Sequence, residues 1–392
     1  MTSNAEDHAP PLLSEKLGID EPPPTHKDIK CAETRKEAIS EWLRSSLIGG
    51  DNEDDGDDAG TNANANGENG EGNGEGEGDG EADGSTKVPA IKVLGHRGAL
   101  YEAPENTISS FETALEQGAV GVELDVFKLK CGKLAVFHGD GSDALPGGLK
   151  SYCDGREGSI VNLTAEEAQE LPLKGAAHFC PEDKLEEAQI EMLEDVLEHA
   201  KESGHELKIE LKGPGTEEPV VELVEQMDMV DQVTFSSFHH DRIEKIRKMR
   251  PQVDEEGKHV YKTGALFTDP PEDFVEMAKE VDATEVHLRY DTCTKDRVDA
   301  IHDAGLDSMA WCRGPTTMRK DMEKFGDVKE EDEHVYSLVL QSGVQAMCVN
   351  RPDKLSSLVE AVADETGDDD NGDNDNDEQL KEQGVKGEYK VS

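Results

Sequence analysis

The sequence lacks long apolar runs. Nowhere do about 18 consecutive apolar side chains occur, which is the length that a membrane-spanning helix needs. The first 13 residues, MTSNAEDHAPPLL, also lack the basic start and the apolar core of a secretory signal peptide. We therefore expect a cytoplasmic protein without a transmembrane segment.

Paired cysteines are absent as well. The seven cysteines are scattered, and no two of them form a Cys-x-x-Cys pair. An odd number of single cysteines argues against a zinc framework and against a disulfide scaffold, and agrees with a reducing compartment. The seven are Cys31, Cys131, Cys153, Cys180, Cys293, Cys312 and Cys348.

Basic side chains are scarce. The chain of 392 residues has 40 Lys or Arg against 89 Asp or Glu, a formal net charge of -49. Such an acidic field repels phosphate backbones and anionic lipid surfaces, so we do not expect nucleic acid as a partner.

Two low-complexity tracts hold much of this acid. Asp51 to Gly84 contains 13 Asp or Glu and 10 Gly, and Asp364 to Glu378 adds 9 acidic residues. Such tracts have too little apolar surface to offset the loss of chain entropy on folding, which predicts disorder. A solvated linker and tail are the favoured interpretation, and calcium buffering is the alternative.

The composition divides the chain into four predicted parts. Residues 1–50 form an extension with one amphipathic helix, and residues 51–87 form an acidic linker rich in Gly and Asn. Residues 88–363 have a globular composition, and residues 364–392 form a charged tail. The N-terminal helix carries Lys and Arg beside its apolar face, so peripheral membrane contact is one interpretation; docking on the globular part or on a partner is the more common fate.

The globular part alternates short β-rich runs with helical patterns. Eight such runs over this length favour an α/β fold, a (β/α)8 TIM barrel, over the alternative of a doubly wound open sheet. The segment at about 139–190, after the second strand, is too long for a loop and is interpreted as a small insertion. The candidate strands are residues 92–95, 120–126, 206–212, 232–238, 263–268, 285–290, 307–312 and 345–350.

Charged side chains fall within or at the ends of these strands, where barrel enzymes place their active sites. Glu123 and Asp125 are two residues apart and therefore point to the same face, as do Lys208, Glu210 and Lys212. Alternation such as KIELK alone is typical of a half-exposed strand. Several inward charges together are hard to explain by packing, because each buried charge needs a partner.

The residue types indicate which partners these charges have. A hard cation with oxygen ligands, Mg²⁺ or Ca²⁺, satisfies Glu123, Asp125 and Glu210 together. Arg97 and Lys212 then face an anion, for which a phosphate is the best candidate. Two histidines at strand ends, His96 and His138, remain to move protons.

The order of these blocks resembles the glycerophosphodiester phosphodiesterase family. Gly-His-Arg-Gly at 95–98 is followed by Pro-Glu-Asn-Thr at 104–107, by GVELDV at 121–126 and by a strand that ends in His138. ELKIELK, SSFHHDRI, MAWC and VNRPDKL follow in order, so that the resemblance covers nearly all of 91–360.

The resemblance implies a metal-dependent (β/α)8 phosphodiesterase that splits glycerophosphodiesters into glycerol 3-phosphate and an alcohol. One histidine would remove a proton from the nucleophile, either water or the neighbouring glycerol hydroxyl, and the other would protonate the departing alkoxide. The sequence leaves these two roles open. Carried over by position, His96 and His138 are the acid/base pair, Glu123, Asp125 and Glu210 hold the cation, Arg97 and Lys212 bind the phosphate, and Trp311 lines the substrate pocket.

The loop after the first strand has expected roles too. The glycines of Gly-His-Arg-Gly let the backbone turn at the barrel mouth. Pro104 and Asn106 are expected to organise the loop before the first helix, and Glu105 to join the polar network around the metal. His239, His240 and His287 are interpreted as structural or pocket-rim residues.

Some positions depart from the family pattern. His138 is followed by Gly139-Asp140 rather than directly by Asp, the usual Arg-Thr after it is missing, and Trp311 is followed by Cys-Arg-Gly rather than Thr-Val-Asn. These departures bear on substrate choice more than on hydrolysis. The alternatives are a lysophospholipase D-like hydrolase of lysophospholipids and a catalytically silent phosphate-ester binding module.

Overall fold

The structure is a computed structural model. It describes residues 12–25, 27–48, 91–141, 145–175, 177–186, 188–314 and 331–364. The predicted acidic linker and all but the first residue of the predicted tail lie outside the described residues, so their predicted disorder stays a prediction.

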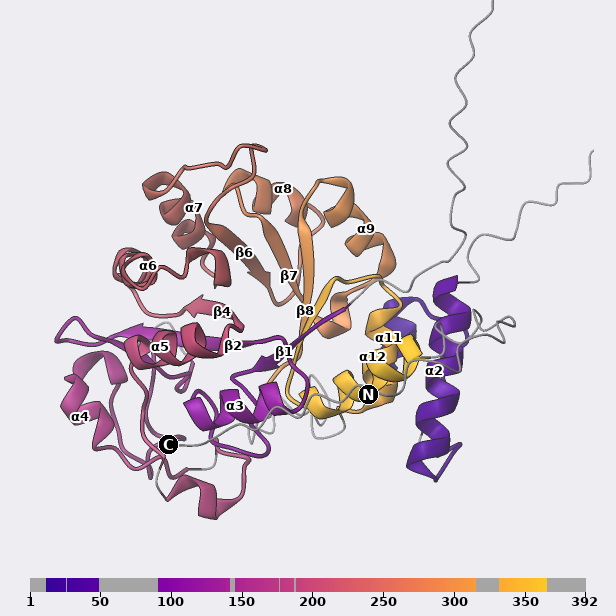
Figure 1. The fold of residues 1–392 in the computed structure, drawn as a ribbon, viewed down its shortest axis with the longest axis horizontal. Coiled ribbons are helices and arrows are strands. Elements are labelled where there is room, and N and C mark those ends of the chain that lie inside the picture. The colour runs from indigo at the N-terminus through magenta and orange to yellow at the C-terminus, as the bar shows by residue number, and fades with distance from the viewer. Residues whose placement is uncertain are drawn as a thin grey trace, which may run out of the picture.

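Eight parallel strands close into a barrel (Figure 1). Their order is β1-β9-β8-β7-β6-β5-β4-β2, and β1 pairs with β2 as well as with β9. The predicted (β/α)8 barrel is therefore confirmed, and the open doubly wound sheet is excluded. The barrel strands are β1 (Lys92–His96), β2 (Gly121–Lys128), β4 (Glu206–Leu211), β5 (Val233–Ser237), β6 (Lys262–Phe267), β7 (Glu285–Arg289), β8 (Asp307–Trp311) and β9 (Ala346–Val349).

Helices follow the strands and cover the barrel. Thr107 caps the first of them, since its hydroxyl accepts a hydrogen bond from the Ser110 backbone N–H. Phe111 and Ala114 of this helix are buried against the barrel. The helices of the barrel are α3 (Ile108–Glu116), α5 (Leu193–Ser203), α6 (Glu217–Gln226), α7 (His240–Met249), α8 (Phe274–Glu280), α9 (Lys295–Asp303), α11 (Glu333–Leu340) and α12 (Pro352–Asp364), with 3₁₀ turns η4 (Val230–Gln232) and η5 (Tyr290–Thr292).

The strand residues alternate between two environments. Val122 and Leu124 of β2 belong to the apolar core between the sheet and the helices. Glu123 and Asp125 point to the other side, into the barrel, and are buried. Bulky branched apolar residues usually fill the interior of such a barrel. Here charged side chains occupy it, which marks the interior as the place to look for a site.

The predicted insertion has a small core of its own. A short strand, β3 (Leu134–Val136), pairs antiparallel with β2, and the chain between it and α5 contains η2 (Ile160–Asn162), α4 (Ala165–Gln169) and η3 (Glu182–Leu185). Phe127, Phe137, Leu149 and Tyr152 pack together there. The insertion is thus anchored to the end of β2 and reaches the mouth of the barrel.

The N-terminal extension docks on the barrel. Figure 1 shows α2 (Ala32–Ile48), in indigo, running alongside α11 and α12. Ile39 and Leu43 are fully buried there and Trp42 is half-buried. A second, short helix that the sequence did not predict, α1 (Leu13–Leu17), packs against α11. Of the proposed fates of the extension, docking on the barrel is the one observed.

The expected absence of a membrane-spanning helix and of disulfides can be examined in the described residues only. Within them, no helix is both long and apolar enough to cross a membrane. All seven cysteines lie in described segments and none forms a disulfide. The compartment itself stays a prediction.

Candidate active site

The end of β1 brings a histidine and an arginine to the barrel mouth. Arg97 adopts the left-handed region with φ 56°, and its backbone N–H donates to the Glu123 carbonyl at 2.9 Å. The flanking glycines allow α3 to approach closely. A Cβ on Gly98 would lie 2.3 Å from the Ser110 hydroxyl, and one on Gly95 would lie 2.8 Å from Ala114 Cβ. Gly98 adopts φ 89°, a conformation that favours glycine, so the turn uses this glycine, and close helix packing is a reason for both.

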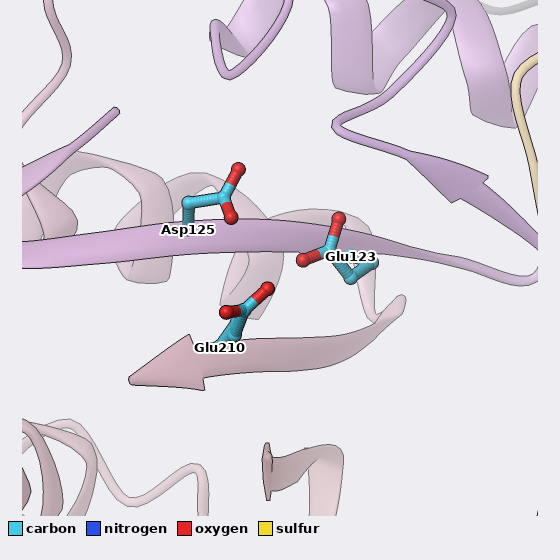
Figure 2. Close-up of side chains that lie close together, drawn as sticks. All are labelled: Glu123, Asp125 and Glu210. Atoms are coloured by element: carbon cyan, nitrogen blue, oxygen red, sulfur yellow. The ribbon is translucent and has the colours of Figure 1, made fainter. Parts of the chain in front are cut away.

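Three carboxylates converge from two neighbouring strands. Figure 2 shows Glu123 and Asp125 of β2 and Glu210 of β4 pointing toward one another. Each offers one oxygen such that all three oxygens lie within 4.8 Å of each other. The register explains this, because Asp125 lies directly opposite Glu210 in the β2–β4 ladder. The predicted face-sharing of these side chains is confirmed.

The carboxylates are crowded, and their titration reflects it. Burial, together with the charges of Asp125 and Glu210, raises the pKa of Glu123 well above its usual range. Burial alone would raise the pKa of Asp125 too, but the positive charges of Lys212 and Arg97 have the larger effect. The pKa of Asp125 therefore lies well below its usual range. Protons in the metal-free cluster therefore reside on Glu123 rather than on Asp125.

Asn106 holds Asp125 in place. The Asn106 side-chain amide donates to Asp125 Oδ2 at 2.9 Å, and its carbonyl accepts from the Asp125 backbone N–H at 3.2 Å. Asn106 does so from the left-handed region, with φ 61°. Its role thus extends beyond the loop organisation expected from the sequence.

Two cations lie beside the carboxylates. Lys212 Nζ is 3.3 Å from Asp125 Oδ1 and 3.5 Å from Glu210 Oε1. Arg97 Nη1 donates to Glu105 at 3.0 Å, and Arg97 Nε lies 3.3 Å from Asp125 Oδ2. Glu105 therefore joins this network through Arg97, and both cations reach the pocket described below.

The donor set fits a divalent cation. Four buried or nearly buried carboxylates face one buried and one half-buried cation, so the fully ionised cluster has about two negative charges unbalanced. Carboxylate oxygens are the ligands that Mg²⁺ and Ca²⁺ prefer. The three converging residues Glu123, Asp125 and Glu210 are the ones able to hold such an ion.

The predicted His96 is buried and the predicted His138 is half-buried, and the pKa of each ring is lowered. Burial, and then the charge of Arg97, lower the pKa of His96 to about 3 and hold the pKa of His138 well below its usual range. His96 Nε2 lies 3.8 Å from Glu123 Oε2. Each ring is also held at Nδ1, His96 by the Asn350 side-chain oxygen at 2.7 Å and His138 by the Tyr152 hydroxyl at 2.9 Å.

These groups surround one pocket of about 400 Å³ at the carboxyl ends of the strands. Of the eight residues predicted for the site, seven line it, and Asp125 lies behind them with 1% of its surface exposed. Trp311 forms one wall, in edge-to-face contact with Phe238 at 5.4 Å between ring centroids. The seven are His96, Arg97, Glu123, His138, Glu210, Lys212 and Trp311.

Three residues that hold the two histidines, directly or through a neighbour, were not predicted. Tyr152 comes from the insertion, where no local pattern marks it, and Glu331 precedes α11 and contacts Asn350 rather than the pocket. Asn350 belongs to the VNRPDKL block and follows the last strand, where site residues of a barrel are expected, so its position was a sequence signal for a role in the site.

His287, interpreted from the sequence as a structural or pocket-rim residue, lines the pocket from inside the barrel and contacts Glu285. His240, interpreted in the same way, does not line the pocket, and its Nε2 lies 3.0 Å from the carbonyl oxygen of the lining residue Leu266.

Comparison with known proteins agrees with this geometry. The glycerophosphoryl diester phosphodiesterase family matches residues 96–354. A glycerophosphodiester phosphodiesterase of Caldanaerobacter subterraneus subsp. tengcongensis is 27% identical over 274 residues, 68% of this chain and 97% of the relative. One from Bacillus altitudinis is 34% identical over 169 residues, 42% of this chain and 64% of the relative.

Solved structures share the fold. One is a phosphodiesterase of Oleispira antarctica in complex with the product sn-glycerol-3-phosphate. It is 24% identical with a TM-score of 0.54, and the match covers 69% of this chain and 97% of the Oleispira antarctica chain. A glycerophosphodiester phosphodiesterase of Agrobacterium tumefaciens has a TM-score of 0.51 and 23% identity, with 68% and 99% covered. With the family match spanning nearly all of the barrel, the chain belongs to the glycerophosphoryl diester phosphodiesterase family and is a phosphodiesterase.

Proposed function

We propose that the protein is a metal-dependent phosphodiesterase that hydrolyses glycerophosphodiesters to glycerol 3-phosphate and an alcohol. The observation that carries the proposal is the convergence of three kinds of group on one pocket: a carboxylate cluster, two cations and two histidines. The product named for the Oleispira antarctica structure supports glycerol 3-phosphate as the product here.

The protein groups divide the work by charge. Arg97 and Lys212 bind the phosphate and stabilise the negative charge that spreads over its oxygens in the transition state. One of His96 and His138 takes the proton of the nucleophile, which is water or the neighbouring glycerol hydroxyl. The other donates a proton to the departing alkoxide. Trp311 forms the wall that the substrate contacts.

Glu123, Asp125 and Glu210 hold Mg²⁺ or Ca²⁺ in this proposal. A bound divalent ion supplies Lewis-acid stabilisation of phosphate oxygens. Asn106 keeps Asp125 aligned for the ion through its two hydrogen bonds. The crowding that raises the pKa of Glu123 supports the assignment, because an added positive charge relieves it.

The test follows product release. Purified protein is incubated with glycerophosphocholine, and glycerol 3-phosphate is measured with and without EDTA, and after adding back Mg²⁺ or Ca²⁺. We expect release that EDTA abolishes and a metal restores, and a loss of about 10²–10⁴ in turnover for His96→Ala and for His138→Ala. No release from glycerophosphocholine with either metal would reject this proposal, and wild-type turnover in both variants would reject the two-histidine mechanism.

One observation favours a second candidate, hydrolysis of lysophospholipids. Phe238 lines the pocket next to Trp311 and is 39% exposed, which gives the pocket mouth an apolar rim suited to an acyl chain. A parallel assay with lysophosphatidylcholine tests it. If lipids are substrates, Phe238→Ala should lower turnover of the lipid much more than that of glycerophosphocholine; equal effects on both would reject this candidate.

A further inference from the structure

The orientation of the Asn350 side chain is fixed by its surroundings. Its Nδ2 lies 2.6 Å from Glu331 Oε1 and 2.8 Å from the Arg313 carbonyl oxygen. The Arg313 carbonyl only accepts hydrogen bonds, so the amide NH₂ must face it, and the same NH₂ reaches the Glu331 carboxylate. A flipped amide would place an oxygen against two oxygens. The Asn350 side-chain oxygen therefore faces His96.

This orientation fixes the tautomer of His96. Asn350 Oδ1 lies 2.7 Å from His96 Nδ1 and can only accept, so Nδ1 carries the hydrogen. The form that can act as a base is the neutral ring, in which only one nitrogen carries hydrogen. Its other nitrogen, Nε2, then bears a lone pair, and it is the nitrogen on the side of Glu123. His96 thus presents a proton acceptor to the site.

Glu331 holds the far end of this chain of contacts. Its Oε1 accepts from Asn350 Nδ2, and its Oε2 accepts from the Asn350 backbone N–H at 3.1 Å and from the Tyr336 hydroxyl at 2.7 Å. Glu331 is buried, its carboxylate forms no salt bridge among the residues that the structure describes, and burial raises its pKa to about 7. A carboxylate buried without a countercharge is costly for stability, which points to a role other than stability.

We propose that Glu331 is a positioning residue: through Asn350 it fixes His96 as the Nδ1–H tautomer, so that His96 is the base and His138 the acid. The inference rests on the proposed function and assigns the two roles that it leaves open. In the step, the nucleophile's O–H proton moves to His96 Nε2 as its oxygen bonds to phosphorus. The bond from phosphorus to the alcohol oxygen breaks, and that oxygen takes a proton from His138.

The contacts of His138 agree with this division. Its Nδ1 partner is the Tyr152 hydroxyl, which can donate as well as accept. Because the Tyr152 hydroxyl can accept from Nδ1–H, this contact also suits a protonated His138, which carries hydrogen on both nitrogens. The protonated ring gives its Nε2 hydrogen to the alkoxide and becomes neutral, whereas the Asn350 contact leaves a neutral His96 with a lone pair at Nε2.

The decisive variant is Glu331→Gln. A glutamine has one acceptor oxygen and one NH₂, so its NH₂ must oppose either Asn350 Nδ2 or the Asn350 backbone N–H, two donors. We expect kcat to fall about 10²-fold with KM within about threefold, as for a group that acts only on proton transfer. Tyr336→Phe is the matched control. It removes one hydrogen bond from the same carboxylate and leaves both bonds to Asn350, so kcat should stay within about threefold even if the melting temperature falls.

Two readouts separate positioning from a structural effect. Long-range ¹H–¹⁵N correlation spectra of histidine-labelled protein with Mg²⁺ report which nitrogen of His96 carries hydrogen, with the signals assigned by their loss in His96→Ala. We expect the Nδ1–H form in the wild type and a mixture of tautomers in Glu331→Gln. A nitrophenyl ester, whose leaving group needs no acid, should restore turnover to His138→Ala but neither to His96→Ala nor to Glu331→Gln.

The outcomes distinguish the inference from the function beneath it. An Nε2–H tautomer in the wild type, wild-type kcat in Glu331→Gln while His96→Ala is inactive, or rescue of Glu331→Gln by the nitrophenyl ester would overturn the positioning role and leave the proposed function standing. Wild-type turnover in His96→Ala itself would overturn the proposed function.

Discussion

Lys208 Nζ lies 2.7 Å from Oε1 of Glu285, inside the barrel and on the same face of β4 as the predicted metal ligand Glu210. Thr234 and His287 complete the cluster, each within hydrogen-bond distance of the Glu285 carboxylate. Burial alone would raise the pKa of Glu285, but the charge of Lys208 and the hydrogen bond from His287 have the larger effect. The pKa of Glu285 therefore lies below its usual range. A second charged group thus occupies the barrel beside the carboxylate cluster.

Breaking this pair should destabilise the protein strongly. Lys208→Met leaves the Glu285 carboxylate buried without its cation, which we expect to lower the free energy of unfolding by about 3–5 kcal/mol. The loss should grow as pH rises, because the Glu285 pKa is then raised in the folded variant and protonation relieves the buried charge at low pH. Urea denaturation at several pH values measures both effects.

The double variant Lys208→Met/Glu285→Leu is the control for that prediction. It removes both charges and should recover much of the lost stability, since an apolar pair of similar volume often replaces a buried ion pair without loss. A single variant as stable as the wild type at every pH would show that the pair does not contribute as argued.

The docked N-terminal helix should matter for stability, and the acidic tracts should not. Leu43 of α2 is 1% exposed, so Leu43→Ala should cost about 2–5 kcal/mol in unfolding free energy. In contrast, replacing residues 51–87 by a Gly/Ser linker of equal length and removing 365–392 should leave melting temperature and turnover nearly unchanged, since these tracts have few apolar residues. Calorimetric melting of the variants tests both parts.

Either of two results would contradict this picture. A Leu43→Ala variant that melts with the wild type would mean that α2 adds nothing to the barrel. A large loss from the linker replacement or the tail removal would mean that the predicted boundaries of the globular part are misplaced.

The sequence predicted the barrel well because its strands are marked locally. Runs such as those at β4 and β7 combine β-rich composition with turn signals, and all eight barrel strands lie within two residues of the predicted bounds. The pairing of charged residues also followed from local geometry, since Glu123 and Asp125 share a face whatever the tertiary structure. The pairing of β2 with β4 in the folded barrel then brings these two residues beside Glu210.

The parts that the sequence did not predict depend on contacts between distant segments. Tyr152 reaches His138 from inside the insertion, and Glu331 meets Asn350 from the chain before α11. Neither contact has a spacing or a composition that announces it. Nor was α1 predicted, because a helix of 5 residues has little periodicity to recognise.

The carboxylates predicted to bind metal should be essential for activity and dispensable for folding. Glu123→Ala, Asp125→Ala and Glu210→Ala should each lose most of the turnover, because three oxygen ligands act together on one ion. Without metal, Glu123→Ala should be as stable as the wild type or more so, since it removes a crowded charge. Titration calorimetry with Mg²⁺ and Ca²⁺ gives the affinities, and thermal melting gives the stabilities.

Asp125 provides a contrast within this set. Its carboxylate also bonds to Asn106 and lies beside Lys212, so Asp125→Ala should lower the melting temperature of the metal-free protein. Unchanged metal affinity in any one variant would remove that residue from the ligand set.

Metal binding should strengthen as pH rises because Glu123 must lose a proton to act as a ligand. Its pKa is raised in the metal-free protein by burial, Asp125 and Glu210, so part of the protein carries a proton there at pH values above 4.5, the ordinary value for Glu. Below the raised pKa, the apparent affinity for Mg²⁺ or Ca²⁺ should change by up to about tenfold per pH unit. Asp125 adds nothing to this dependence near neutral pH, because its pKa is lowered.

The same linkage predicts the stability of the metal-free protein. A group whose folded-state pKa is raised stabilises the folded state at low pH, and this contribution is lost as pH rises through the folded-state pKa. The contribution of Glu123 should therefore fall with rising pH in EDTA, whereas saturating metal should reverse the trend, since it binds the ionised form. Calorimetry in two buffers of different ionisation enthalpy measures the protons released on binding, and Glu123→Gln, which cannot titrate, is the control. Equal proton release from the wild type and Glu123→Gln between about pH 5 and pH 8 would show that the proton does not reside on Glu123.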